Sequence, residues 1–214
     1  MVTADVIATC AADVAPYTIE QVIKVESRGD PLAINVNPKT VPIVKDGKKI
    51  GTKKVYFQLP IQITDLQDAV TVAQLAIDAG YSVDMGYMQI NSKNLPKLGY
   101  SVSEIFNPCT NLKAGSTILK EGYSRASAVM GEGQDALRTA LSLYNTGDTQ
   151  RGFSNGYVAR YYNSGNVPVT SSKDDSTETK TVVINPYTAS TTIADTNRSQ
   201  ANDQDDYPYV DVKF

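Results

Sequence analysis

The first clear pattern in the chain is an apolar stripe at helical spacing near the N-terminus. Ile19, Val22 and Ile23 recur three and four residues apart, which places them on one face of a helix. Pro16 suits the first turn of such a helix, and the Gly and Pro residues after the stretch favour its end there. The pattern predicts a helix over residues 13–26.

The next stretch, residues 41–59, is typical of strands. β-Branched and aromatic residues flank Asp46-Gly47, a dipeptide typical of a two-residue hairpin turn. Several lysines accompany them, and lysines are common on exposed sheet edges. We therefore expect a small β-hairpin inserted between the first two helices.

Helical periodicity returns after this hairpin. The clearest segment is 64–79, which has an apolar face, Thr64 as the expected N-cap and Gly80 at its end. The remaining predicted elements are a loop leading into a short helix over 83–95, helices over 108–130 and 134–144, a turn over 145–148, and a last helical turn or two over 155–163.

The composition changes near the C-terminus. Thr, Ser, Asp and Asn dominate there, and few large apolar side chains remain. The first 163 residues carry 16 Lys and Arg against 15 Asp and Glu, whereas the last 51 carry 4 against 8. We expect a mainly α (α+β) domain over 1–163, followed by an acidic, flexible and mostly disordered tail over 164–214.

The composition also excludes several kinds of function. The sequence has no His, which excludes Ser-His-Asp and Cys-His centres and removes the commonest metal ligand. Cys10 and Cys109 lack metal-site spacing, so we predict no metal and no cofactor. The net charge of −3 does not suit nucleic-acid binding. No apolar run reaches the roughly 20 residues of a membrane span, and residues 1–12 lack the features of a signal peptide.

Glu26 is the first candidate for chemistry. It follows Val22 and Ile23 by four and three residues, so its carboxyl lies on the apolar face of the predicted helix. Burial raises a carboxyl pKa, and a carboxyl still protonated near neutral pH can protonate a glycosidic oxygen. The face argument alone leaves a plain alternative open, namely a surface Glu paired with Lys24 or Arg28.

Short motifs follow one another in a definite order along the chain. They are Glu26-Ser27, Asp30-Pro31, Ala33-Ile34-Asn35, Gly86-Tyr87-Met88-Gln89-Ile90-Asn91, Leu143-Tyr144-Asn145-Thr146-Gly147 and Tyr157-Val158-Ala159-Arg160. This series resembles the soluble lytic transglycosylases, which are related in fold to goose-type lysozyme. Three features are similar, more narrowly, to the lytic transglycosylases of type IV secretion and conjugation systems. They are the long insert after the first motifs, the Ser-Val-Asp sequence that opens the Gln-Ile-Asn motif, and the stretch 106–115. The resemblance covers roughly residues 8–163, and its implied fold is a lysozyme-like helical domain.

The resemblance implies a role for the residues of the first motifs. Glu26 is the single catalytic acid/base, and Ser27 hydrogen-bonds it or the acetamido group of the substrate. Gln89 and Asn91 hold sugar hydroxyls or the N-acetyl group. From the residues alone, Gln89 and Asn91 are equally compatible with helix caps or turns.

The later motifs also take roles from the resemblance. It implies that Tyr144 places its hydroxyl near the catalytic acid or the reacting sugar, that Asn145 shapes the turn, and that Tyr157 lines the cleft. From the residues alone, Tyr144 is compatible with packing and Asn145 with ordinary turn chemistry. Met88 and Ile90 are expected in the core.

The implied activity is lytic cleavage of peptidoglycan glycan strands at the bond between N-acetylmuramic acid and N-acetylglucosamine. The product ends in 1,6-anhydromuramic acid. One rival is a hydrolytic muramidase of the same fold, with Asp84 or Asp30 positioning water. Two further rivals are a non-catalytic glycan-binding assembly module and a cytosolic interaction domain.

Spacing alone leaves Cys10 and Cys109 as either two buried thiols or one long-range disulfide. The narrower resemblance places a cysteine at each of these points and implies a disulfide between them. It also implies a periplasmic location, since peptidoglycan is extracytoplasmic and the periplasm permits oxidation. We expect the C-terminal tail to be where secretion-system proteins bind.

Overall fold

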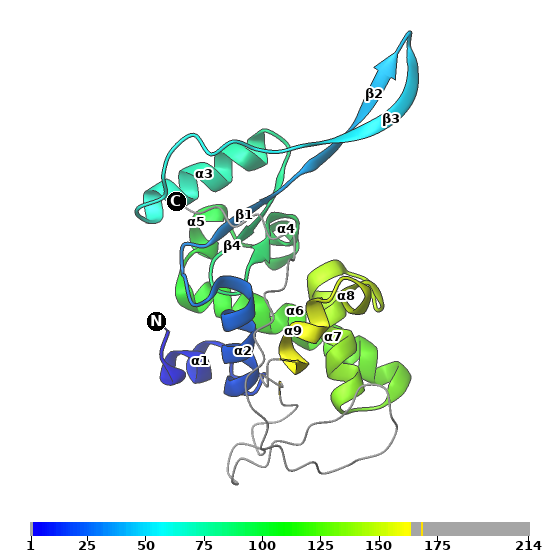
Figure 1. Ribbon diagram of the computed structural model, residues 1–214. Helices are drawn as coiled ribbons and strands as arrows, with labels where there is room; N and C mark the ends of the chain where they lie inside the picture. The colour runs from blue at the N-terminus through cyan, green and yellow to red at the C-terminus, as the bar shows by residue number, and fades with distance from the viewer. Residues whose placement is uncertain (1, 164–167, 169–214) are drawn as a thin grey trace, which may run out of the picture. The chain divides into compact units, whose positions relative to one another are not determined.

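The computed structural model describes residues 2–163 and Pro168, and within them a mainly helical protein with two small antiparallel sheets (Figure 1). This confirms the mainly α fold class. The helices are α1 (Ala4–Cys10), α2 (Pro16–Ser27), α3 (Leu66–Asp78), η1 (Ser92–Asn94), α4 (Leu95–Leu98), α5 (Val102–Ile105), α6 (Pro108–Met130), α7 (Gln134–Thr146), α8 (Arg151–Ser154) and α9 (Tyr157–Tyr162). The strands are β1 (Ile34–Asn37), β2 (Lys39–Lys45), β3 (Lys48–Val55), β4 (Ser82–Met85) and β5 (Ile90–Asn91). The predicted C-terminal tail lies outside the described residues.

The longest predicted helices are confirmed, with changes at their ends. Helix α6 spans the predicted 108–130, and Asn107 caps it by accepting hydrogen bonds from two backbone N–H groups. Helix α2 begins at Pro16 and not at residue 13, because Pro16 takes the first helical position. The N-cap of α3 is Asp65 and not Thr64, whose hydroxyl instead donates to the Asp68 carboxylate at 2.7 Å.

The predicted hairpin is confirmed as the ribbon β2–β3. Its turn is Asp46-Gly47, and both residues have positive φ, 50° and 74°, as a two-residue turn of this kind requires. The ribbon projects away from the helices in Figure 1, and its hydrophobic side chains remain exposed, with Val44 at 59% and Ile50 at 61%.

A three-stranded sheet, in the order β1-β4-β5, was not predicted. The interpretation of residues 83–95 as a loop entering a short helix was wrong in its first half, which forms β4, a turn and β5. These strands are four and two residues long and alternate apolar with polar side chains, so no helical or long strand pattern reveals them. In β4, Val83 and Met85 point into the core and are fully buried.

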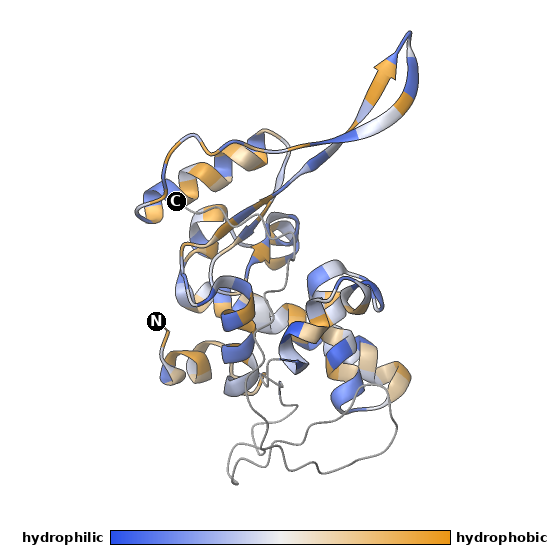
Figure 2. Cartoon of the chain, in the orientation of Figure 1, coloured by the Kyte–Doolittle hydropathy of each residue, from blue (hydrophilic) through white to orange (hydrophobic). Residues whose placement is uncertain are grey.

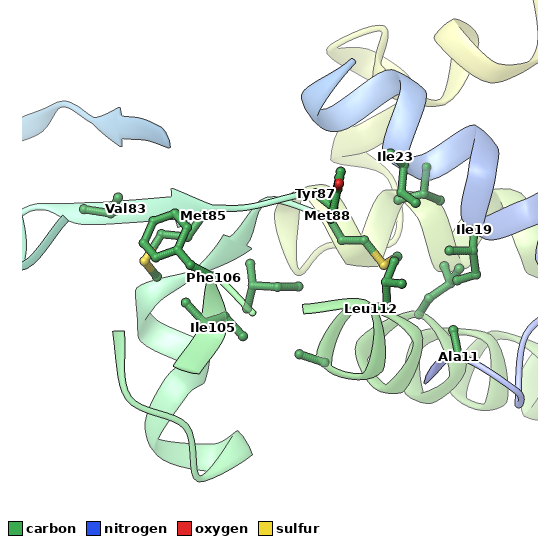
Figure 3. Packing of buried hydrophobic residues seen from close by; sticks show 14 of the residues in the cluster. Ala11, Ile19, Ile23, Val83, Met85, Tyr87, Met88, Ile105, Phe106 and Leu112 are labelled. Carbon is green, nitrogen blue, oxygen red and sulfur yellow. The ribbon is translucent and has the colours of Figure 1, made fainter. Parts of the chain in front are cut away.

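The core joins this sheet to the helices. Figure 3 shows Met88 beside Leu112 of α6 and the isoleucines of α2, and Met88 and Ile90 are both buried, as expected. Gly115 of α6 leaves room for this contact, because a Cβ atom there would lie 2.3 Å from the Met88 sulfur. Figure 2 shows hydrophobic positions on the helices and also on the ribbon, where Val44 and Ile50 are exposed.

Two further features concern the N-terminal part. Cys10 at the end of α1 and Cys109 at the start of α6 form a disulfide, with their Cα atoms 5.1 Å apart. It closes a loop of 99 residues and ties α1 to the longest helix. Among the described residues, no helix is long and apolar enough to cross a membrane.

Candidate active site

Glu26 lies in the last turn of α2, where the chain leaves the core. The apolar residues that precede it on the same face are buried, with Ile19 and Val22 at 0% exposure and Ile23 at 5%. Arg28 ends the helix in the left-handed conformation, at φ 55°. Glu26 itself is half-buried, so its carboxyl reaches the boundary between core and solvent.

The Ser27 hydroxyl stabilises this helix end. It donates a hydrogen bond to the Ile23 carbonyl at 3.1 Å and accepts one from the Gly29 N–H at 3.2 Å. Both partners are backbone groups, and neither contact involves Glu26. The structure therefore gives Ser27 a role in holding the chain where α2 ends.

Two tyrosines of α9 hold the Glu26 carboxyl. The Tyr157 hydroxyl donates a hydrogen bond to Glu26 Oε1, and the Tyr157 and Tyr161 hydroxyls lie 2.8 Å apart. Both rings are buried and pack edge to face, with centroids 5.4 Å apart. Tyr157 was a predicted site residue and Tyr161 was not, although it follows Tyr157 by four residues and so shares its helix face.

The pKa of Glu26 is raised from 4.5 to about 7. Burial is the main cause, since it removes water from the charged form. The hydrogen bond from Tyr157 lowers the pKa, the negative charge of Asp84 raises it, and the positive charge of Arg160 lowers it. A large fraction of Glu26 is therefore protonated near neutral pH, which is the state that a general acid needs.

Tyr144 lies at the junction of α7 with the turn between β4 and β5. Its hydroxyl donates a hydrogen bond to the Met88 carbonyl at 2.6 Å. Burial and the charge of Glu26 raise the pKa of this hydroxyl well above 10, so it remains neutral. The charge of Glu26 thus acts on the Tyr144 hydroxyl, whose proton is already bound to the backbone.

Asn145 follows Tyr144 and is exposed. Its side-chain oxygen accepts a hydrogen bond from Asn155 Nδ2 at 3.0 Å, and the Asn155 oxygen accepts one from the Tyr157 N–H at 3.0 Å. These two contacts link the end of α7 to the first residue of α9. Asn145 therefore helps to position Tyr157. The predicted turn at 145–148 begins later, because α7 continues through Thr146 and ends at Gly147.

Gln89 occupies the turn between β4 and β5 with φ 47°. Its side-chain nitrogen donates hydrogen bonds to the carbonyls of Ala33 at 3.1 Å and Gly86 at 3.0 Å. The amide nitrogen of Gln89 thus closes the turn and ties it to the segment before β1. This left-handed position is one of three non-glycine residues with positive φ in the described chain.

Asn91 ends β5 and contacts both the sheet and the next helix. Its side-chain nitrogen donates to Asp84 Oδ1 at 2.6 Å, and its side-chain oxygen accepts from the Lys93 N–H at 3.1 Å. The second contact is a helix cap, which is the alternative that the sequence left open for Asn91. The first contact connects Asn91 to Asp84, whose negative charge raises the pKa of Glu26.

The structure distinguishes the two candidate second carboxylates. The negative charge of Asp84 raises the pKa of Glu26. Asp30 is exposed and accepts a hydrogen bond from the Leu32 N–H at 2.8 Å, within its own turn. Asp84 is thus the candidate carboxylate whose charge acts on Glu26. Within residues 2–163 and 168, no group of three or more Cys, Asp or Glu side chains is arranged to hold a metal ion.

Comparison with known proteins assigns the chain to a family. The family model described as Transglycosylase SLT domain matches residues 6–182. The chain belongs to this family. No solved structure matches the chain.

Named relatives of this family member come from two bacterial groups. The chain is 38% identical over 151 residues to Protein virB1 of Rhizobium radiobacter, which covers 71% of this chain and 55% of the relative. It is also 38% identical over 145 residues to the Type IV secretion system protein virB1 of Brucella abortus biovar 1 (strain 9-941), which covers 67% of this chain and 53% of the relative. The chain thus spans about half the length of these relatives.

Proposed function

We propose that this transglycosylase SLT domain protein is a peptidoglycan lytic transglycosylase and that Glu26 is its catalytic acid and base. The observation that carries the proposal is the Glu26 carboxyl, which is desolvated at the end of α2, bound by Tyr157 and has a pKa of about 7. A protonated carboxyl in this position is suited to protonate a glycosidic oxygen.

The hydrogen bonds around Glu26 determine which oxygen carries the proton. Tyr157 donates to Oε1 and is itself in contact with the Tyr161 hydroxyl, which completes a chain of donors toward the carboxyl. Because Oε1 accepts from Tyr157, Oε2 is the oxygen that we propose carries the acidic proton. This arrangement leaves the proton free for the substrate.

In the proposed reaction, Glu26 protonates the oxygen between N-acetylmuramic acid and N-acetylglucosamine, and the C–O bond to the muramic acid breaks. The acetamido oxygen of the substrate stabilises the positive charge at the anomeric carbon. Glu26, now ionised, accepts the proton of the muramyl 6-hydroxyl, whose oxygen forms the new bond to the anomeric carbon. The product is a 1,6-anhydro ring and no water is consumed. Intramolecular attack of this kind has a high effective concentration.

We propose that the residues around this acid form the substrate site. Some contact the substrate directly, and others hold the turns of the site in place. The residues are Ser27, Gln89, Asn91, Tyr144, Asn145 and Tyr157. The Gln89 side-chain nitrogen and the Tyr144 hydroxyl already donate hydrogen bonds to backbone carbonyls. The side-chain oxygen of Gln89 and the hydroxyl oxygen of Tyr144 therefore serve as acceptors for sugar hydroxyls.

A hydrolytic muramidase is the second candidate, and the effect of the Asp84 charge on Glu26 favours it. A carboxylate beside the acid is the group that could position a water molecule in a two-carboxylate mechanism. Digestion of purified peptidoglycan, with mass spectrometry of the products, separates the two. Anhydro ends support the transglycosylase, and products heavier by one water support the muramidase.

Substitution of Glu26 tests the catalytic assignment. Glu26→Gln keeps an oxygen that accepts from Tyr157 but removes the acidic proton, so peptidoglycan cleavage should fall about 10²–10⁴-fold. Glu20→Gln is the matched control, because Glu20 is on the same helix and exposed. Cleavage by Glu26→Gln within twofold of the parent rejects Glu26 as the acid.

We further propose that the protein acts in the periplasm and opens the cell wall for a type IV secretion or conjugation apparatus. One relative is named Type IV secretion system protein virB1, and the other is named Protein virB1. The disulfide between Cys10 and Cys109 suits an oxidising compartment. Thiol counting in unfolded, unreduced protein from the periplasm tests this placement: no reactive thiol is expected, and two reactive thiols contradict it.

A further inference from the structure

The charged side chains of the β2–β3 ribbon are almost all positive. Residues 31–64 carry six lysines and a single acid, Asp46. Lys39, at the base of the ribbon, donates a hydrogen bond from Nζ to the Ala79 carbonyl at 2.5 Å. The other five lysines are exposed and make no hydrogen bond or ion pair with any part of the chain that the structure describes: Lys45, Lys48, Lys49, Lys53 and Lys54.

Exposed apolar side chains lie among these lysines near the turn of the ribbon. Val44 is 59% and Ile50 61% exposed. Strand pairing places Val44 opposite Lys49, and the register shift after Ile43 leaves Ile50 as the extra residue of a β-bulge beside this pair. Two apolar groups and a cation are therefore neighbours. We call residues 43–50 the ribbon tip, which projects away from the helices in Figure 1.

The stability of the ribbon does not explain this composition. Lys45 and Lys48 are register partners, and like charges directly opposite each other destabilise paired strands. A two-stranded hairpin is only marginally stable in water, and Val44 and Ile50 gain little from burial where they stand. Thr would favour a strand at both positions as well. Sequences break local rules of this kind mainly at functional sites.

The ribbon tip fits a surface that is both negative and apolar. Addition of a partner strand is disfavoured, because Pro42 lacks an N–H on the edge of β2 and the bulge at Ile50 interrupts β3. A nucleic acid or a glycan attracts lysines but offers little apolar surface for Val44 and Ile50. The boundary between headgroups and acyl chains in an anionic bilayer accepts both kinds of side chain.

We propose that the ribbon tip docks on an anionic phospholipid bilayer. Lys45, Lys48 and Lys49 lie among the negative headgroups, and Val44 and Ile50 enter the boundary with the acyl chains. The negative surface offsets the repulsion between the lysines, and the boundary buries the two apolar groups. This contact is peripheral and holds the domain at the membrane surface. It does not depend on the proposed chemistry of the active site.

Sedimentation of the intact protein with vesicles tests the proposal. The protein should bind vesicles of equal parts phosphatidylglycerol and phosphatidylcholine, and it should not bind vesicles of phosphatidylcholine alone. Binding should weaken as salt is raised from about 0.1 M to about 1 M, because the Debye length falls from about 10 Å to about 3 Å.

Substitutions of lysine test the electrostatic part of the contact. Lys49→Gln should weaken binding to the anionic vesicles about fivefold, and the triple variant that adds Lys45→Gln and Lys48→Gln should weaken it about a hundredfold. Lys113→Gln is the matched control, because Lys113 is an exposed lysine of α6, and its binding should stay within twofold of the parent.

Substitutions of the apolar side chains distinguish a bilayer from other polyanions. The double variant Val44→Thr, Ile50→Thr keeps β-branched side chains and every lysine, so the ribbon and its charge remain. It should weaken vesicle binding about tenfold, because apolar atoms no longer leave water. Its affinity for a DNA duplex should equal that of the parent, since a duplex contacts the lysines alone.

The outcomes decide between the bilayer and its alternatives. The proposal is rejected if the parent does not bind the anionic vesicles, or if the folded triple variant binds them as the parent does. If the folded Val44→Thr, Ile50→Thr variant binds vesicles like the parent, or if the parent prefers the duplex, the tip is a general polyanion site and the assignment to lipid is wrong. Cleavage of soluble peptidoglycan fragments should be unchanged in all these variants, so a failure of the proposed activity leaves the vesicle result intact.

Discussion

The two sheets of this molecule are built from adjacent stretches of chain but have opposite surroundings. β1 ends at Asn37 and β2 begins at Lys39, so one residue separates the three-stranded sheet, which we call the site sheet, from the ribbon. In the three-stranded sheet, Val83 and Met85 of the central strand are fully buried. In the ribbon, Val44 and Ile50 are more than half exposed. Strand pairing thus holds most of the ribbon, which is tied to the helical part through Lys39 and the Ala79 carbonyl, whereas the site sheet is fixed by the helices.

Asn111 of α6 is the side chain that fixes the site sheet. It is 1% exposed, its nitrogen donates to the carbonyls of Met85 and Ile105 at 2.9 Å each, and its oxygen accepts from the Met88 N–H at 2.8 Å. Gly86 is needed beside it, because a Cβ atom there would lie 2.4 Å from the Asn111 nitrogen. No comparable side chain anchors the turn of the ribbon among the described contacts.

The largest effect on stability is therefore expected from Asn111→Ala. Three buried backbone groups lose their partner, and each such loss costs about 1–3 kcal/mol, so the free energy of unfolding should fall by at least about 3 kcal/mol. Denaturant unfolding measures this. Asn107→Ala is the comparison on the same helix, since loss of its exposed cap should cost only about 1 kcal/mol. Equal losses in the two variants contradict the anchoring role.

A smaller effect is expected at Glu26, and it depends on pH. Since the folded-state pKa of about 7 is above the unfolded value near 4.5, ionisation opposes folding. The penalty is absent below pH 4.5, grows as the pH rises toward 7 and is complete above it, at no more than about 3 kcal/mol. Glu26→Gln should thus be more stable than the parent at pH 8 and equal to it at pH 4.

Thermal unfolding at a series of pH values measures this difference. Glu20→Gln, on the exposed side of α2, should show no such trend. A Glu26→Gln protein whose stability relative to the parent is the same at pH 4 and pH 8 shows that the carboxyl is not desolvated, and it removes the physical basis for the acid.

The difference between the two sheets also explains what the sequence could predict. The ribbon has a local signal, because Asp46-Gly47 specifies its turn without help from the rest of the chain. Helix α6 likewise has Pro108 at its start and a repeating apolar face. The site sheet has no such signal, since its strands are short and its pairing depends on Asn111, which is 26 residues from Met85.

The same reasoning applies to the site residues. Helix periodicity fixes the face on which Glu26 lies but leaves a surface role open, so the candidate roles of Glu26 and Tyr157 both came from the resemblance of their motifs. The contacts between them span 131 residues, so neither the Tyr157 hydrogen bond nor the part played by Tyr161 follows from local spacing. The contacts of Asp84 are similarly distributed, because Asn35 and Asp84 meet only through strand pairing across 49 residues.

The smallest effect should come from the ribbon, and a matched pair of substitutions measures it. Val44→Thr replaces a 59% exposed side chain with one that also favours strands, so stability should stay within about 0.5 kcal/mol of the parent. Val83→Thr makes the same change at 0% exposure and buries a hydroxyl, which should cost about 1–3 kcal/mol. Peptidoglycan fragment cleavage should be unchanged in Val44→Thr, because the site sheet does not depend on the ribbon for its packing. A loss from Val44→Thr as large as that from Val83→Thr indicates that the ribbon is covered in solution, and the contrast between the two sheets then fails.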